Sequence, residues 1–105
     1  TPMLIVMDYD ETYTEDPSIW DAFILLLRTR GHTIICCTMR DEEACDNTDI
    51  IRHMSALQIE IIYAAQYQDK WEAVQEAGYH PENAIWIDDR PMYIYMNRNF
   101  EEIDQ

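Results

Sequence analysis

The sequence of 105 residues contains little glycine, few basic residues and no long hydrophobic run. With only 2 glycines and 4 prolines there is little chain for linkers, which predicts one domain over residues 1–105. The longest apolar runs, MLIVM and AFILLL, are too short to span a bilayer, so we expect no membrane segment and a cytoplasmic location. Cysteines are few and lack a CxxC spacing, and adjacent Cys36 and Cys37 would point to opposite faces of a strand. We therefore predict reduced thiols and no zinc site.

Most of the charged residues are acidic. Against 7 Lys and Arg stand 21 Asp and Glu, which gives a formal net charge of −14. Such a surface repels nucleic-acid phosphates at long range and disfavours non-specific nucleic-acid binding. It suits a protein that gathers divalent cations, and it equally suits one that is simply kept soluble by its charge. Composition leaves both interpretations open.

Short apolar stretches alternate with amphipathic segments four times along the chain. Strands are expected over 3–7, 33–37, 59–63 and 84–87, and helices over 17–30, 41–57, 69–77 and 91–97. The alternation predicts an α/β fold, with a doubly wound, Rossmann-like, mainly parallel sheet of four to five strands and helices on both faces. The inward-facing helical side chains are expected to be Ile19, Trp20, Phe23, Ile24, Leu27, Ile50, Ile51, Met54, Leu57, Trp71, Val74 and Ala77.

Acidic residues follow the first and the last of these strands. Asp8 and Asp10 come after the first strand, and Asp88 and Asp89 come after the fourth. Parallel sheets bind ligands beyond the carboxyl ends of their strands, so these carboxylates are expected to meet if the two strands are neighbours. Their crowding would raise pKa values and oppose folding unless a cation compensates it. Mg²⁺ is the cation that tolerates few protein ligands together with several waters.

Three more polar side chains are expected at the same edge. Thr38 ends the second strand, and Lys70 lies in the first turn of a helix, where the helix dipole disfavours a cation and an anionic partner is expected. Arg40 is placed either to contact an anionic ligand or to pair with Asp41 or Glu42. Carboxylates, a hydroxyl and an ammonium together suit phosphoryl transfer through a carboxylate nucleophile, in two displacement steps.

In this order, the motifs resemble those of the haloacid dehalogenase superfamily of phosphohydrolases over residues 3–97. The superfamily's DxDx[TV] motif after an apolar strand is matched by Asp8, Asp10 and Thr12, although Glu11 replaces a glycine that is frequent there. TIICCT matches the strand that ends in Thr or Ser, Lys70 matches the lysine at a helix start, and IWIDD matches the last acidic motif.

The resemblance implies an aspartyl-phosphate mechanism and a magnesium cofactor. It makes Asp8 the nucleophile and Asp10 the general acid/base. The implied phosphate-binding residues are Thr38, Lys70 and Arg40, and the implied Mg²⁺ ligands are Asp8, Asp10 (through its carbonyl), Asp88 and Asp89. We therefore expect a Mg²⁺-dependent phosphomonoester hydrolase.

The spacing of the motifs bears on the substrate. Residues 11–37 and 39–69 each have room for one helix and one strand, which predicts the minimal type of the superfamily without a cap domain. Members without caps often act on bulky phosphoesters. The IDDRP string resembles phage-type polynucleotide kinase phosphatase domains and implies a nucleic-acid 3′-phosphate, whereas the net charge of −14 disfavours a polyanionic partner.

Two other functions and two oligomeric states are compatible with parts of the pattern. A response-regulator receiver domain uses similar residues, but there the phosphorylated Asp ends the third strand and the Lys comes last. A non-catalytic member of the same fold would bind metal or a protein without turnover. In the last helix, Met92, Tyr93, Tyr95 and Met96 are expected either to cover the sheet edge or to form a self-association patch, in a monomer or a weak homo-oligomer.

Overall fold

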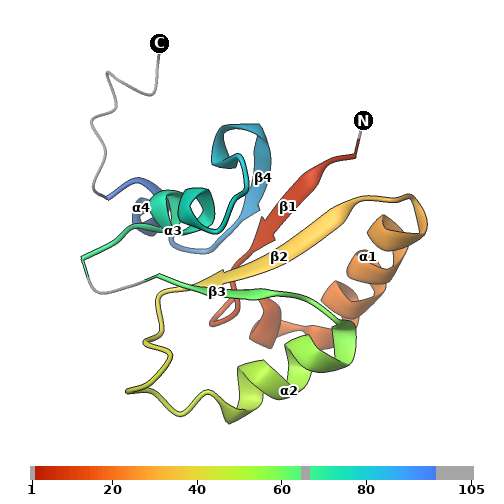
Figure 1. The fold of residues 1–105 in the computed structure, drawn as a ribbon. Helices are drawn as coiled ribbons and strands as arrows, with labels where there is room; N and C mark the ends of the chain where they lie inside the picture. The colour runs from red at the N-terminus through yellow and green to blue at the C-terminus, as the bar shows by residue number, and fades with distance from the viewer. Residues whose placement is uncertain (1, 65–66, 97–105) are drawn as a thin grey trace.

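The computed structural model describes residues 2–64 and 67–96, which contain a parallel sheet of four strands (Figure 1). The strands are β1 (Leu4–Met7), β2 (Thr33–Thr38), β3 (Ile61–Tyr63) and β4 (Ala84–Ile87). They lie in the order β3-β2-β1-β4, and every neighbouring pair is parallel. The predicted α/β class and the parallel sheet are therefore confirmed. The third strand begins at Ile61 rather than at Ile59, although Ile59 is still buried.

Within residues 2–64 and 67–96, four α-helices accompany the sheet: α1 (Pro17–Thr29), α2 (Thr48–Leu57), α3 (Lys70–Glu76) and α4 (Met92–Tyr95). Short 3₁₀ helices lie at Tyr13–Glu15 and Pro81–Asn83. Asp16 caps α1 by accepting the Ile19 N–H. The last helix was expected to run to residue 97, which lies outside the described residues. No helix in the described part of the chain combines the length and hydrophobicity needed to cross a membrane.

The prediction that a helix starts at Asp41 is wrong, because residues 41–47 form a loop. The Asp41 carboxylate accepts the N–H groups of Glu43 and Ala44 at 2.8 Å each. The Asn47 side-chain amide donates to the carbonyls of Asp41 and Glu42. These local side chain–backbone bonds satisfy groups that a helix would otherwise pair, so the helix begins only at Thr48.

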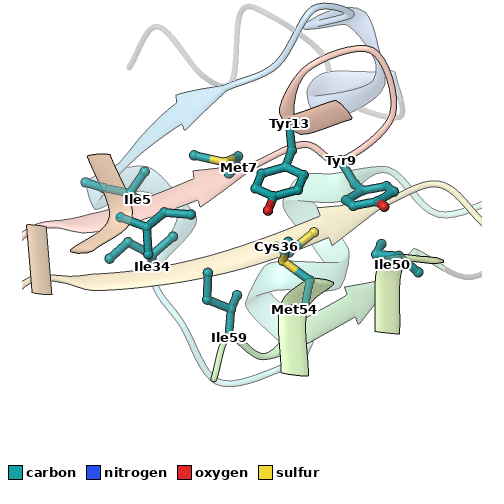
Figure 2. Close-up of a cluster of buried hydrophobic side chains, with 10 residues drawn as sticks. Ile5, Met7, Tyr9, Tyr13, Ile34, Cys36, Ile50, Met54 and Ile59 are labelled. Carbon is teal, nitrogen blue, oxygen red and sulfur yellow. The ribbon is translucent and has the colours of Figure 1, made fainter. Parts of the chain in front are cut away.

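Successive side chains of the central strands point to opposite faces of the sheet, so one hydrophobic cluster forms on each face. Ile5, Met7, Ile34 and Cys36 point toward α1 and α2, where they meet Ile24, Ile50, Met54, Ile59, Tyr9 and Tyr13 (Figure 2). Val6, Ile35 and Cys37 point the other way and pack with Ile62, Ala64, Ala73 and Val74. Cys36 and Cys37 therefore lie on opposite faces, as expected, and both are free thiols.

Three of the expected inward positions are wrong. Ile19 is 61% exposed and Ile51 is 50% exposed, while Ala77 lies past the end of α3 and is also exposed. Each helical residue rotates the side chain by about 100°, so Ile51, which follows the fully buried Ile50, points away from the sheet. The same rotation separates Ile19 from Trp20. The buried stripes of α1 and α2 are thus narrower than the apolar pattern indicates.

Aromatic side chains join the last helix to the rest of the fold. The Tyr95 ring lies 5.4 Å from the Trp71 ring of α3, and Trp71 stacks on Trp86 of β4 at 6.4 Å between centroids. Figure 1 shows α3 and α4 side by side next to β4. Tyr95 thus belongs to packing contacts, whereas Met92 is 62% exposed.

Gln58, just after α2, is expected to be a site where glycine stabilises the protein. It is exposed and adopts φ 57° and ψ 43°, the left-handed region that disfavours a Cβ. Its hydrogen bonds are made by the backbone: its N–H donates to carbonyls of α2, and its carbonyl accepts from Arg28. Gln58→Gly should therefore raise the free energy of unfolding by about 0.5–1 kcal/mol in urea denaturation, after the entropy that glycine adds to the unfolded chain is subtracted. Gln58→Ala keeps the Cβ and should show no gain; equal gains in both variants would contradict the explanation.

Candidate active site

The candidate site lies at the carboxyl ends of β1 and β4. The chain moves outward from β1 to β2 and β3 and then returns to the other side of β1, so the connection order reverses between β1 and β4. Such a reversal point is where open α/β sheets bind ligands. The Asp8 N–H donates to the Ile87 carbonyl at 2.9 Å, which extends the ladder past β1 and brings Asp8 beside Asp88.

A pocket of about 360 Å³ at this edge brings together every site residue that the sequence predicts. Its lining comprises Asp8, Asp10, Thr38, Arg40, Lys70, Asp88 and Asp89, together with Glu11, Met39, Arg90 and Tyr93. The residues come from the ends of β1, β2 and β4, from the start of α3 and from α4. Residues up to 85 positions apart in sequence thus converge on one volume because parallel strands share an edge.

Asp8 is a buried carboxylate held on both oxygens. Its Oδ1 accepts from Lys70 Nζ at 2.9 Å, and its Oδ2 accepts from the Thr12 hydroxyl at 3.0 Å. Burial raises the pKa of Asp8 to about 6, and the neighbouring Asp89 and Asp88 carboxyls add to the rise, while Lys70 opposes it. From the crowding of carboxylates, the sequence predicts a raised carboxyl pKa at this edge; for Asp8 the pKa is raised, with burial as the larger cause. The two hydrogen bonds therefore fix the orientation of the Asp8 carboxylate, but its negative charge is only partly compensated.

Lys70 bridges two of the carboxylates. Its side chain is 3% exposed, and Nζ donates to Asp8 at 2.9 Å and to Asp88 Oδ2 at 2.6 Å. Burial acts to lower the pKa of Lys70, but the two carboxylates outweigh it and the pKa is raised. These carboxylates are the anionic partners expected for a cation in the first turn of a helix. An ammonium has three N–H groups, so one remains beyond these two contacts.

Asp8, Asp88 and Asp89 form a set of possible metal ligands. Each offers a carboxylate oxygen, and these oxygens lie within 4.8 Å of one another. An all-oxygen set of this charge suits a hard divalent cation. The Asp10 carboxylate is not part of this set.

The Thr12 hydroxyl lies between two of the possible metal ligands, Asp8 and Asp89. Its hydroxyl lies 3.0 Å from Asp8 Oδ2 and 3.3 Å from Asp89 Oδ1, and its carbonyl accepts from Trp20 Nε1 at 2.9 Å. Thr12 matched the DxDx[TV] pattern, yet sequence reasoning assigned it no role. Hydrogen bonding with Asp8 and Thr12 lowers the pKa of Asp89. The feature of the sequence that could have indicated this contact is a short polar side chain four residues after Asp8.

Thr38 is buried at the end of β2, and its hydroxyl proton is available for a further hydrogen bond. Its Oγ1 accepts the Arg40 N–H at 3.1 Å, and its carbonyl accepts the Ala64 N–H at 2.9 Å. Because the hydroxyl oxygen acts as acceptor in this contact, its O–H remains able to donate to a ligand in the pocket.

Arg40 contacts carboxylates on two different segments. Its Nε and Nη2 donate to Asp10 at 2.9 and 2.7 Å, and its Nη1 and Nη2 donate to Asp49 at 2.8 and 3.1 Å. The ion pairs are therefore with Asp10 and Asp49 rather than with Asp41 or Glu42. Asp49 was not predicted as a partner of Arg40, because the helix expected over 41–57 places it in the helix interior, whereas in the structure it lies in the first turn of α2.

Four further lining residues were not predicted as site residues: Glu11, Met39, Arg90 and Tyr93. Arg90 directly follows the acidic pair, and its half-exposed side chain lies 3.4 Å from the Glu11 carboxylate. Tyr93 comes one helical turn later and also lines the pocket. Glu11 adopts φ 62°, a left-handed conformation, which explains in physical terms why glycine is frequent at this position of the resembling motif. In the sequence, only the position of Arg90 directly after Asp89 could have indicated that it lines the pocket.

Comparisons with protein-family models, with curated proteins and with solved structures find no match to this chain. The side-chain arrangement of the pocket is therefore the basis for assigning a function.

Proposed function

We propose that this chain is a Mg²⁺-dependent phosphomonoester hydrolase of the haloacid dehalogenase type that uses Asp8 as its nucleophile. The observation that carries the proposal is the environment of Asp8: a buried carboxylate held by Lys70 and Thr12, within 4.8 Å of ligand oxygens on two other carboxylates. The strand order and the helices on both faces support assigning the sheet as the doubly wound, capless core of that superfamily.

In the first step, an Asp8 carboxylate oxygen attacks the phosphorus atom. The bond between phosphorus and the ester oxygen breaks, and protonated Asp10 gives its proton to that leaving oxygen. The products are an alcohol and an aspartyl phosphate on Asp8. The Thr38 hydroxyl and the remaining N–H of Lys70 donate to the phosphoryl oxygens, where negative charge redistributes.

In the second step, water attacks the phosphorus of the aspartyl phosphate. The Asp10 carboxylate takes a proton from the water, the bond between phosphorus and the Asp8 oxygen breaks, and inorganic phosphate leaves. Both aspartates then return to their starting forms. When bound by Asp8, Asp88, Asp89 and the Asp10 carbonyl, Mg²⁺ supplies positive charge that offsets the charge of the carboxylates and of the phosphoryl group.

The proposal predicts that hydrolysis depends on the metal. Protein treated with EDTA should hydrolyse p-nitrophenyl phosphate at background rate, and adding Mg²⁺ should restore the rate by roughly 100-fold or more, because uncompensated carboxylates repel the phosphate. Colourimetric release of p-nitrophenol measures this. Glu43→Gln, which removes one exposed carboxylate outside the pocket, serves as the control and should behave as wild type.

A panel of substrates then tests the nucleic-acid 3′-phosphate that the IDDRP resemblance implies against other phosphoesters. It contains a 3′-phosphorylated oligonucleotide, a phosphopeptide and a sugar phosphate, each assayed for phosphate release. Mg²⁺ binding measured by calorimetry, without turnover of any of these esters, would contradict the hydrolase and favour the non-catalytic metal-binding alternative.

A further inference from the structure

The Arg40 guanidinium is fully occupied by groups of the protein itself. It has five N–H donors. Nε and Nη2 each donate to Asp10, Nη1 and Nη2 each donate to Asp49, and Nη1 also donates to the Asp46 carbonyl at 3.3 Å. With all five donors engaged, a substrate phosphate would have to displace a carboxylate to reach this side chain. Direct phosphate binding is therefore the less favourable role.

The Arg40 guanidinium also packs against the face of the Tyr9 ring. Its central carbon lies 5.2 Å from the centroid of the Tyr9 ring, within the range of a cation–π contact. Tyr9 is fully buried, its hydroxyl lies 2.6 Å from His53 Nδ1, and its ring stacks on Tyr13 at 5.6 Å. A buried, stacked part of the hydrophobic cluster thus supports Arg40, whose own side chain is only 19% exposed.

Asp10 depends on this arrangement more than Asp8 does. Its side chain is 49% exposed, and Arg40 donates one hydrogen bond to each of its carboxylate oxygens. A half-exposed carboxylate samples several rotamers unless its partners fix one. A guanidinium that binds both oxygens fixes the plane and direction of the carboxylate as well as its position.

We propose that Arg40 is a positioning residue for Asp10, itself anchored by Asp49, and not a ligand of the substrate phosphate. This inference rests on the proposed function, because it presumes that Asp10 is the general acid/base. Each Asp10 oxygen accepts one N–H and keeps a second lone pair, which is the place for the proton that Asp10 gives and takes. Proton transfer needs that oxygen within hydrogen-bonding reach of the reacting oxygen, so orientation controls the rate.

Kinetics of Arg40→Lys and Asp49→Asn separate the two roles. Lysine keeps the charge but lacks the forked donors of the guanidinium. Asp49 lies outside the pocket lining and interacts with Arg40 and with Tyr9, the residue whose ring supports Arg40. We expect kcat to fall about 10- to 100-fold for Arg40→Lys and several-fold for Asp49→Asn. KM and the inhibition constant of inorganic phosphate should change by less than about twofold. Glu43→Gln is the matched carboxylate control and should keep wild-type constants.

The leaving group supplies a readout that a purely structural role would not change. For a series of aryl phosphates, kcat/KM of Arg40→Lys should fall most for the least acidic leaving phenols, because these need the proton from Asp10. A uniform loss over the series, with a lower melting temperature, would show that Arg40 is only structural. A tenfold or larger rise in the inhibition constant of phosphate, with an unchanged leaving-group dependence, would assign Arg40 to phosphate binding. Either result overturns the inference.

Two further results separate this inference from the proposed function. If wild type and Asp8→Asn are equally inactive toward all substrates, the hydrolase proposal fails and the positioning role fails with it. If wild type is active and Arg40→Lys matches it, only the positioning role fails. Independently of activity, the Nε–H resonance of Arg40 in ¹⁵N-labelled protein should shift in Asp10→Asn, and no shift would show that the contact is absent in solution.

Discussion

Asp8→Asn is expected to abolish phosphomonoester turnover and to leave the protein folded. The carboxamide that replaces the carboxylate is not a nucleophile toward phosphorus, so the first step has no attacking group. Loss of a nucleophile removes most of an enzyme's rate enhancement, and we expect kcat to fall at least roughly 1,000-fold. Release of p-nitrophenol in Mg²⁺ measures the rate, and the near-UV circular dichroism spectrum checks the fold. Retention of wild-type activity would show that Asp8 is not the nucleophile.

The same substitution should stabilise the metal-free protein at neutral pH. Burial raises the pKa of Asp8 to about 6, above the ordinary value of 3.8 that applies to the unfolded chain. A carboxyl with a raised folded-state pKa binds protons more tightly when folded. It therefore opposes folding above about pH 6 and has no effect on stability below about pH 4, where both states are protonated.

Removing the ionisable group should thus raise the free energy of unfolding by roughly 1–3 kcal/mol at pH 7.5 and leave it unchanged near pH 4. Urea denaturation of both proteins in EDTA over pH 4–8 measures the difference. Glu43→Gln, which removes an exposed carboxylate, should give a difference that does not grow with pH in this way. An Asn variant less stable than wild type at pH 7.5 would mean that Lys70 compensates Asp8 fully.

The positions of the strand-end residues were predictable because they follow from one rule of geometry. Asp8 and Asp88 directly follow strands and Thr38 is the last residue of one, and parallel strands bring their carboxyl ends to one edge. The hydrophobic pattern was enough to define the strands, so it was enough to define the edge. The pairing of Lys70 with two carboxylates was not predictable in detail, although the unfavourable place of a cation at a helix start indicated an anionic partner.

The partners of Arg40 could not be derived from the sequence. Arg40 reaches Asp49 only because residues 41–47 form a loop that returns the chain to the start of α2, and the sequence pattern favoured a helix there. That error arose because the spacing of apolar residues says nothing about competing local bonds from Asp41 and Asn47. A long side chain with several rotamers can satisfy many carboxylates, and only the packed structure selects among them.

Lys70→Met is expected to have the largest effect on stability. The side chains of Lys70 and Asp88 are each 3% exposed and that of Asp8 is 9% exposed, so the substitution leaves two carboxylates in a buried place without a cation. Breaking a buried ion pair on one side costs roughly 3–5 kcal/mol, more than removing both partners. The free energy of unfolding in EDTA at pH 7.5 should fall by about 3 kcal/mol, and phosphatase activity should be lost because the phosphoryl group loses an N–H donor.

Two comparisons test whether charge is the cause of this loss. Adding Mg²⁺ should stabilise Lys70→Met more than it stabilises wild type, because a divalent cation at Asp8, Asp88 and Asp89 replaces the missing positive charge. The double variant Asp8→Asn, Lys70→Met should be more stable than Lys70→Met alone, since it removes one of the two uncompensated carboxylates. Urea denaturation of the four proteins completes the cycle. A loss below about 1 kcal/mol in Lys70→Met, unaffected by Asp8→Asn, would mean that the ammonium does not bridge the two carboxylates in solution.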